Sequence, residues 1–347
     1  MELVYTIGDD MEQVKKWFEI NKREFPWREK KDPYRVLISE IMLQQTRASV
    51  VVPYFVRWLE RFPTIWELSQ ASEAEVIKLW EGLGYYSRAR NLLKLAKRVV
   101  LEYKGQIPDS REDLIKLEGL GEYTVGAILS FGFHQKAVAL DGNVTRVMAR
   151  WLGFDKCARK HAAELRASVY QHLPNQKAHV VMEGLIELGA EVCKKKPLCH
   201  VCPLRDTCLA RKQGMEEVLP ILPLRKPVQE IFRAVGCIAY DNEYLVRQVP
   251  KGEIMEGLFE FPYVACEKNP PTYQKAFEAF SKSTLSFVSP LVWEKHHFTQ
   301  FKCNLYPFHF IAKEKNLIPY YQWVAKEKLS LLPFSSGHKK IFRQLIA

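Results

Sequence analysis

The sequence predicts a multidomain chain in which an all-α domain precedes a smaller α/β domain. Its 347 residues exceed what one compact core usually holds. Up to about residue 210 the pattern is one of short amphipathic segments with polar breaks, and strand-like runs follow later. Between them, residues 219–227 form a proline-punctuated basic stretch that is typical of a semi-rigid linker. We therefore expect a helical domain over 1–215, a linker over 216–230 and a second domain over 231–347.

Local signals place the first elements. Asp32 precedes Pro33, and an aspartate that caps free amides before a proline with a preset φ predicts a helix from Pro33 through roughly Gln45. In the second domain the hydrophobic patterning of the sequence predicts strands and helices in alternation. The strands are expected over 234–240 and 303–311, and the helices over 273–280 and 338–345.

The charge of the chain favours a polyanionic partner. The formal net charge is +11 and the pI is near 9.1, and each basic side chain that meets a phosphate releases condensed counterions. Composition alone equally allows a protein that is merely basic. The sequence begins without a basic and then apolar leader, and no apolar run reaches membrane-spanning length. We expect a cytoplasmic monomer, associated with the nucleoid if the source is bacterial.

Four of the eight cysteines lie within sixteen residues, and the other four are scattered. The clustered ones are Cys193, Cys199, Cys202 and Cys208. Such spacing indicates metal ligation more than a disulfide framework, and it allows a zinc site, a [4Fe–4S] cluster or, less often, four unligated thiols. Zinc ribbons usually carry two Cys-x-x-Cys pairs and this lobe, residues 193–208, has one, so we favour iron–sulfur.

A glycine turn marks a second candidate contact with nucleic acid. Gly119 and Gly121 lie between a helix expected to end near Lys116 and another expected to begin near Glu122, which predicts a helix-hairpin-helix near residues 109–132. Glycine reaches positive φ, lets a phosphate approach, and leaves amides at the next helix start free to donate. An ordinary connection between helices is the alternative.

Glu40 is the first candidate acid. Its neighbours one turn away on the expected helix, Val36, Leu37 and Leu43, are apolar, so its carboxyl should be partly desolvated. Desolvation raises a carboxyl pKa and suits the group to donate a proton. The alternative is a structural carboxylate buried with an arginine such as Arg35 or Arg47.

Asp141 is the second candidate. It follows an apolar run, residues 137–140, and stands at a chain turn before an expected helix. A fixed anion at such a place could face an oxocarbenium ion, whereas the simpler interpretation is a helix cap.

Several motifs resemble the adenine glycosylases of the MutY type, within the endonuclease III superfamily, over nearly the whole chain. Besides the cysteine lobe, they are Pro26-Trp27-Arg28, the run from Ser39 to Thr46, the run from Gly82 to Asn91, and the run from Leu140 to Val147. This resemblance implies a helix-hairpin-helix glycosylase domain with an iron–sulfur lobe, a Nudix-like second domain, and base flipping from duplex DNA.

The resemblance also implies roles for particular residues. Glu40 would protonate adenine, Asp141 would stabilise the sugar cation, and Tyr123 and Asn143 would organise the site. Glu183 would bind the adenine edge. Gln45 and Tyr85 would fill and wedge the duplex at the place that the flipped base has left. Trp27, Arg28 and Leu43 would shape the pocket. Each also has a plainer interpretation, such as core packing for Trp27 and Leu43 or a helix-face charge for Glu183. In strand-cutting relatives a lysine takes the place of Tyr123 and forms a Schiff base, so the tyrosine predicts a monofunctional enzyme.

The second domain resembles the family's Nudix-like module through residues 256–262 and 334–340 but has no Arg-Glu-x-x-Glu-Glu helix for pyrophosphate hydrolysis. In the family this module checks for 8-oxoguanine opposite adenine, so the expected partner is duplex DNA with adenine paired to 8-oxoguanine or guanine. The loop Phe298-Thr299-Gln300 departs from the family's Phe-Ser-His. Another departure is the spacing from Cys193 to Cys199, which has five intervening residues where the family usually has six.

Two rival interpretations remain. An endonuclease III-type glycosylase and lyase would act on oxidised pyrimidines, but Tyr123 and the second domain argue against it. A non-catalytic iron–sulfur DNA-binding protein would use Glu40 and Asp141 only as structural groups.

Overall fold

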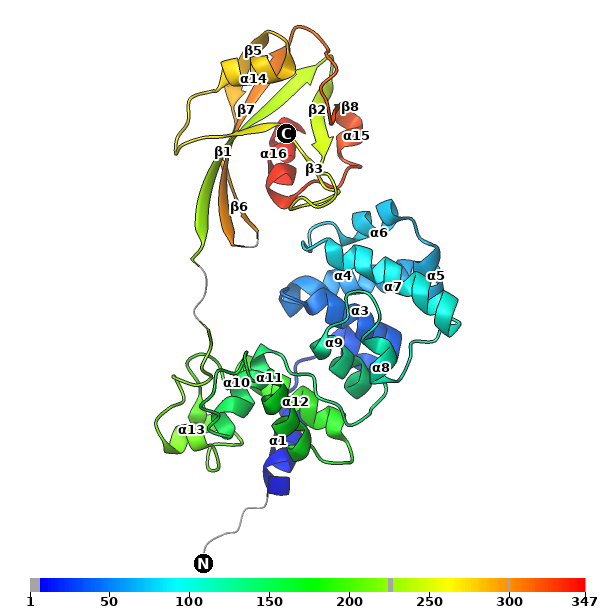
Figure 1. Cartoon of the computed structure of the whole chain (residues 1–347), viewed down its shortest axis with the longest axis vertical. Coiled ribbons are helices and arrows are strands. Elements are labelled where there is room, and N and C mark those ends of the chain that lie inside the picture. The colour runs from blue at the N-terminus through cyan, green and yellow to red at the C-terminus, as the bar shows by residue number, and fades with distance from the viewer. Residues whose placement is uncertain (1–6, 224–226, 299, 347) are drawn as a thin grey trace, which may run out of the picture. The chain divides into compact units, whose positions relative to one another are not determined.

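The computed structural model describes residues 7–223, 227–298 and 300–346 (Figure 1). The chain divides into two compact units. The first comprises residues 1–73 and 87–224, and the second comprises 74–86 and 225–347. The predicted class, a helical domain followed by a β-rich one, is confirmed. The exact domain limits stay predictions.

The chain before the linker is helical. In order, its α-helices are α1 (Ile7–Asn21), α2 (Pro26–Glu29), α3 (Pro33–Leu43), α4 (Ala48–Arg61), α5 (Ile65–Gln70), α6 (Glu73–Trp80), α7 (Ser87–Tyr103), α8 (Arg111–Leu114), α9 (Glu122–Ala127), α10 (Gly142–Trp151), α11 (Ala162–His172), α12 (Ala178–Glu191) and α13 (Leu209–Lys212). A π-helix, η1 (Ile128–Gly132), continues α9, and a 3-10 turn, η2 (Cys199–Val201), lies in the cysteine lobe.

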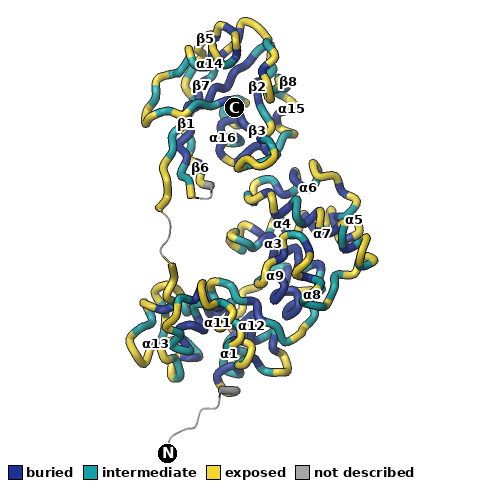
Figure 2. Tube along the Cα trace, viewed as in Figure 1, coloured by how far each residue is buried: buried dark blue, intermediate teal, exposed yellow. Residues whose placement is uncertain are grey.

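Helix α3 runs through the core of the first unit and is buried along most of its length (Figure 2). It begins as predicted, because the Asp32 carboxylate accepts a hydrogen bond from the Arg35 amide at 3.0 Å. It ends at Leu43, two residues before the expected Gln45, because Gln45 takes a φ of +57°. The buried Arg88 guanidinium holds this end by donating to the carbonyl oxygens of Ile41, Met42 and Gln44 at 2.6–2.9 Å.

The glycine turn joins α8 to α9, in the arrangement of a helix-hairpin-helix. Ser110 caps α8, with its hydroxyl accepting from the Asp113 amide at 3.2 Å. Gly119 has a φ of +79°, as a tight turn requires of glycine. Gly121 has a φ of −104°, so it does not use the positive-φ freedom that we expected of both glycines; it instead stands at the N-cap of α9.

The second unit is built on one mixed sheet, with eight strands among its described residues. They are β1 (Gln229–Tyr240), β2 (Glu243–Gln248), β3 (Phe259–Glu260), β4 (Tyr263–Ala265), β5 (Leu285–Pro290), β6 (Glu294–Phe298), β7 (Phe301–Ala312) and β8 (Tyr321–Ala325). Its helices after the linker are α14 (Gln274–Ser281), α15 (Lys326–Leu329) and α16 (Ser336–Ile346), and most of α6 also belongs to this unit. The long strands β1 and β7 run parallel in the middle, from the pair Gln229 and Phe301 to the pair Ala239 and Ile311.

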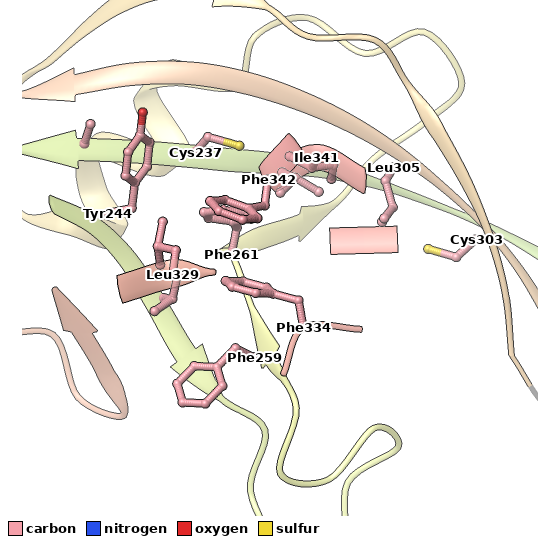
Figure 3. Packing of buried hydrophobic residues seen from close by; sticks show 13 residues of the cluster. Cys237, Tyr244, Phe259, Phe261, Cys303, Leu305, Leu329, Phe334, Ile341 and Phe342 are labelled. Carbon is pink, nitrogen blue, oxygen red and sulfur yellow. The ribbon is translucent and has the colours of Figure 1, made fainter. Parts of the chain in front are cut away.

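Alternate residues of β1 and β7 feed two hydrophobic clusters on opposite faces of this sheet. One cluster contains Phe277 of α14. The other contains Phe342 of α16 together with Phe261, Leu305 and Phe334, and Figure 3 shows the three phenylalanine rings close together, with Leu305 to one side. The predicted strands and helices of this domain are all present, although β1 begins at Gln229, inside the expected linker.

No helix of the described ranges is long and apolar enough to cross a membrane.

Candidate active site

A cavity of about 940 Å³ opens in the first unit and collects nine of the ten predicted catalytic and base-binding residues. Its lining comes from α2 and the chain around it, from α3 and the chain that follows, and from α9, the start of α10 and α12. The predicted residues in the lining are Trp27, Arg28, Glu40, Leu43, Gln45, Tyr123, Asp141, Asn143 and Glu183. Side chains from positions 40, 123, 141 and 183 thus face one space large enough for a flipped nucleobase.

Glu40 is only 7% exposed, and its partner is a tyrosine. The Tyr123 hydroxyl donates to Glu40 Oε2 at 2.7 Å. Burial raises the pKa of the Glu40 carboxyl from 4.5 to about 7. The anions of Asp141 and Glu183 add to this rise, whereas the Tyr123 hydroxyl and the Arg28 charge oppose it. The structural alternative, a pair with Arg35, is not what forms, because Arg35 pairs with Asp32 at 3.3 Å.

Asp141 both caps a helix and faces the cavity. Its Oδ1 accepts from the Val144 amide at 2.7 Å, and its Oδ2 accepts from Asn143 Nδ2 at 2.8 Å. Burial raises the pKa of Asp141, while these hydrogen bonds and the Arg146 charge oppose the rise. The carboxylate is therefore held in one orientation by the start of α10.

Helix α12 brings a second pair of carboxylates to the cavity. Glu183 contacts the Lys31 ammonium, and its Oε2 lies 3.6 Å from Arg28 Nε. One turn later, Glu187 is 0% exposed and accepts from Arg23 Nε at 2.5 Å and from Arg28 Nη2 at 2.8 Å. Although burial by itself raises the Glu187 pKa, these two hydrogen bonds outweigh it and lower the pKa. Arg28 is thus fixed between two carboxylates.

Sequence reasoning missed Arg23, Lys31 and Glu187, which all line the cavity. In sequence the two basic residues resemble solvated surface charges. A signal for Glu187 was present, however. It stands between Ile186 and Leu188 on a largely apolar helix, the same setting that singled out Glu40.

Part of the remaining wall is aromatic, with Phe25, Trp27 and Phe131 in the lining. Trp27 is buried, stacks on Phe25 with ring centroids 4.7 Å apart, and meets Phe55 edge to face at 5.6 Å.

Gln45 is exposed at the mouth, where its positive φ turns the chain away from α3. Tyr85 does not line this cavity; it is 48% exposed and has a φ of +49°. Its proposed wedge role stays a prediction.

The four clustered cysteines share one hollow. Cys193, Cys199, Cys202 and Cys208 all line it, as free thiols of intermediate exposure. Burial raises the pKa of Cys202 to about 12, and negative charge on the other three sulfurs adds to the rise. Four thiolates could therefore persist here only with cationic compensation. No three histidine, cysteine, aspartate or glutamate side chains in the described part of the chain converge tightly enough for a single metal ion.

Helix α10 ties this cysteine lobe to the cavity. Arg146 donates from Nη2 to Asn143 Oδ1 at 2.9 Å and to the Gly189 carbonyl at 2.7 Å, and from Nε to the Cys193 carbonyl at 2.6 Å. One turn later, Arg150 Nη1 lies 3.3 Å from Cys193 Sγ and donates to the Lys194 carbonyl at 2.6 Å. The partner of Asp141 is thus held by the same arginine that holds the cysteine loop.

The predicted lesion loop lies at the turn between β6 and β7. Gln300 is exposed, and its carbonyl accepts from the Gln229 amide at 2.9 Å. The backbone of Phe298 ends β6, and its side chain is not described. Thr299 lies outside the described residues.

The fold and this cavity define a DNA glycosylase of the helix-hairpin-helix class. The family model for the HhH-GPD superfamily of base excision DNA repair proteins matches residues 38–172, and a NUDIX domain model matches residues 234–344. A solved structure described as a thermostable thymine-DNA glycosylase is similar with a TM-score of 0.57 and 27% identity, over 60% of this chain and 97% of that chain.

Curated relatives narrow the class. An adenine DNA glycosylase of Buchnera aphidicola subsp. Schizaphis graminum is 32% identical over 295 residues, which cover 80% of this chain and 85% of the relative. Another, from Buchnera aphidicola subsp. Baizongia pistaciae, is 40% identical over 194 residues, so this chain spans 55% of that relative's length. The chain belongs to the adenine DNA glycosylases, enzymes of base excision repair that hydrolyse N-glycosyl bonds.

Proposed function

We propose that the chain removes adenine paired with 8-oxoguanine or guanine from duplex DNA, as a monomer and without cutting the strand. The observation that carries this proposal is the pairing of Glu40, whose pKa is about 7, with the capped Asp141 in one cavity. Glycosidases use two carboxyl groups with different protonation states in this way. The net charge of +11 suits a duplex partner, and Gly119 and Gly121 are the proposed contacts to its backbone.

Each cavity residue has a part in this mechanism. Protonated Glu40 donates to N7 of the extruded adenine, which makes the base a better leaving group. Asp141 stabilises the positive charge that develops on the sugar, and Asn143 keeps that carboxylate in place. Tyr123 orients Glu40, which afterwards accepts a proton from the attacking water. Glu183 accepts a hydrogen bond from the adenine edge through Oε2, while Oε1 keeps its contact with Lys31.

The test is a single-turnover assay on duplexes with one adenine opposite 8-oxoguanine. We expect free adenine to be released and strand breaks to appear only after alkali, with no covalent adduct trapped by borohydride. Lys31 lies in the cavity but is engaged with Glu183, and position 123 carries no amine. Breaks without alkali together with a trapped adduct would show lyase chemistry, and no adenine release would refute the proposal.

The rate should depend on pH through Glu40. Its folded-state pKa of about 7 lies above the ordinary 4.5, so the donor form predominates below pH 7 and is lost above it. We expect the single-turnover rate to be level at low pH and to fall roughly tenfold per pH unit above the pKa. Fluorescence anisotropy with labelled duplex, over the same range, separates loss of chemistry from loss of binding. A rate that rises with pH would contradict this role.

Gln300 should set the preference for the oxidised partner. An amide can donate and accept hydrogen bonds, as the usual histidine can. Replacing Gln300 by Ala is expected to lower the ratio of the rates opposite 8-oxoguanine and guanine by about 2- to 10-fold, the value of one hydrogen bond. Gln322→Ala, also exposed in the second unit, is the matched control. An unchanged ratio in Gln300→Ala would remove Gln300 from lesion recognition.

We also propose a [4Fe–4S] cluster on the four cysteines. The four cysteines line one hollow, and a four-iron cluster takes four thiolate ligands, one on each iron. We expect about four irons per chain and a broad absorbance near the blue edge of the visible range. Cys199→Ser should lower the iron content, whereas Cys157→Ser, outside the hollow, should not. Stoichiometric zinc in place of iron would overturn the assignment.

A further inference from the structure

The mouth of the catalytic cavity carries an arginine that the proposed steps of adenine excision do not involve. Arg47 lines the cavity two residues after Gln45, and its backbone stands at the N-cap of α4. Its side chain is exposed, and it forms no ion pair or hydrogen bond with any residue that the structure describes. The cation that acts on Glu40 is Arg28, so Arg47 is not the structural partner of Glu40 that the sequence allowed.

The other basic side chains of the lining are already paired with carboxylates of α12. Arg23 donates to Glu187 at 2.5 Å, and Arg28 donates to the same carboxylate at 2.8 Å. Lys31 contacts Glu183. Among the described residues of the lining, the fourth cation, at the mouth, is therefore the one whose charge no carboxylate offsets.

A flipped nucleotide would place a negative charge at this mouth. A nucleotide that enters the cavity base first stays linked to its strand, so a phosphate remains on each side of its sugar. The cavity already holds acidic side chains, and Asp141 is the one proposed to face that sugar. An unpaired guanidinium at the mouth offsets this charge, and its N–H donors match two oxygens of one phosphate.

The backbone that carries Arg47 is held in place before any ligand arrives. The Arg88 guanidinium donates to the Gln44 carbonyl at 2.6 Å and to the Thr46 hydroxyl at 3.3 Å. The Gln44 side chain in turn donates from Nε2 to the Thr124 hydroxyl at 3.2 Å. A fixed attachment point reduces the ordering cost that Arg47 pays when it binds a phosphate.

We propose that Arg47 binds a phosphate of the nucleotide that is flipped into the cavity. The inference rests on the proposed function, because it requires a flipped nucleotide. The contact forms when that nucleotide leaves the stack, so its free energy favours the flipped state over the stacked one. Arg47 therefore differs from Gly119 and Gly121, whose proposed backbone contacts do not depend on flipping.

The experiment measures DNA binding by fluorescence anisotropy at several salt concentrations. One duplex carries a tetrahydrofuran abasic analogue opposite 8-oxoguanine, which has a sugar to flip and no base to excise, and the other duplex is undamaged. On the abasic duplex, Arg47→Met should reduce the slope of log affinity against log salt by about 1, the value of one phosphate contact. The affinity itself should fall roughly tenfold, as for one charged hydrogen bond. On the undamaged duplex both quantities should stay close to those of the wild type.

Two variants serve as controls. Arg57→Met removes an exposed arginine on the same helix but outside the cavity, and it should leave both slopes unchanged. Arg47→Lys keeps the cation and should restore most of the slope on the abasic duplex, which separates loss of charge from a change at the start of α4.

Three results would overturn the inference, and they differ from one another. A wild-type slope in Arg47→Met on the abasic duplex would show that Arg47 meets no phosphate. An equal reduction on both duplexes would make it a general backbone contact and exclude the assignment to the flipped nucleotide. A wild type that binds the two duplexes equally would refute the proposed lesion preference itself, and the role of Arg47 with it.

Discussion

Replacing Glu40 by Gln is expected to slow adenine release roughly 100- to 10,000-fold, the usual contribution of a general acid. Glutamine keeps the size of the side chain and can still accept the hydrogen bond from Tyr123, but it has no carboxyl proton to donate. The assay is single-turnover release of adenine at pH 6.5, where the wild-type carboxyl is largely protonated.

Stability distinguishes loss of chemistry from loss of fold in this variant. The folded pKa of Glu40, about 7, is above the ordinary 4.5, so the wild type loses stability as pH rises from 4.5 through 7 and the buried group ionises. Glu40→Gln removes that penalty, and at pH 8 its melting temperature should equal or exceed that of the wild type. Glu60→Gln, an exposed change on α4, should alter neither quantity. Wild-type rates in Glu40→Gln would exclude Glu40 as the acid.

Replacing Asp141 by Asn should slow the reaction by about 100- to 1,000-fold, the cost of removing one charged stabiliser of a transition state. This substitution separates the two functions of the Asp141 side chain, which are to cap α10 and to carry a negative charge. Asparagine caps helices as well as aspartate does, so the Oδ1 contact with the Val144 amide can persist while the negative charge is lost.

The control for Asp141→Asn is the same change at another cap. Asp32 caps α3 through the Arg35 amide and does not line the cavity. Asp32→Asn should therefore retain the wild-type rate, and both variants should melt within a few degrees of the wild type. Equal rates in the two variants would mean that Asp141 serves only as a cap.

The sequence was most informative where a local pattern has one physical meaning. Asp32-Pro33 predicted the start of α3, and the apolar neighbours of Glu40 predicted its desolvation. The convergence of positions 40, 123, 141 and 183 has no such local signal. It followed from the resemblance of several motifs to one family, and the cavity then brought these residues together.

Other features could not be predicted because they depend on tertiary contacts. Arg23, Lys31 and Glu187 acquire their roles only when α12 packs beside the chain that precedes α3. The early end of α3 depends on Arg88, which lies 43 residues beyond Gln45 in the sequence and donates to the carbonyls at that end. The expectation of a positive φ at Gly121 was wrong, because a glycine at an N-cap takes ordinary extended φ values.

The hydrogen bonds of Arg146 connect chemical damage in the cysteine lobe of this protein to the cavity. Because the Arg146 guanidinium donates both to Asn143 and to the Cys193 carbonyl, a chemical change that rearranges the cysteine loop is expected also to loosen the hydrogen bond that holds the Asp141 carboxylate. The rate of adenine release would then fall because the Asp141 carboxylate is misaligned, although the helical domain remains folded.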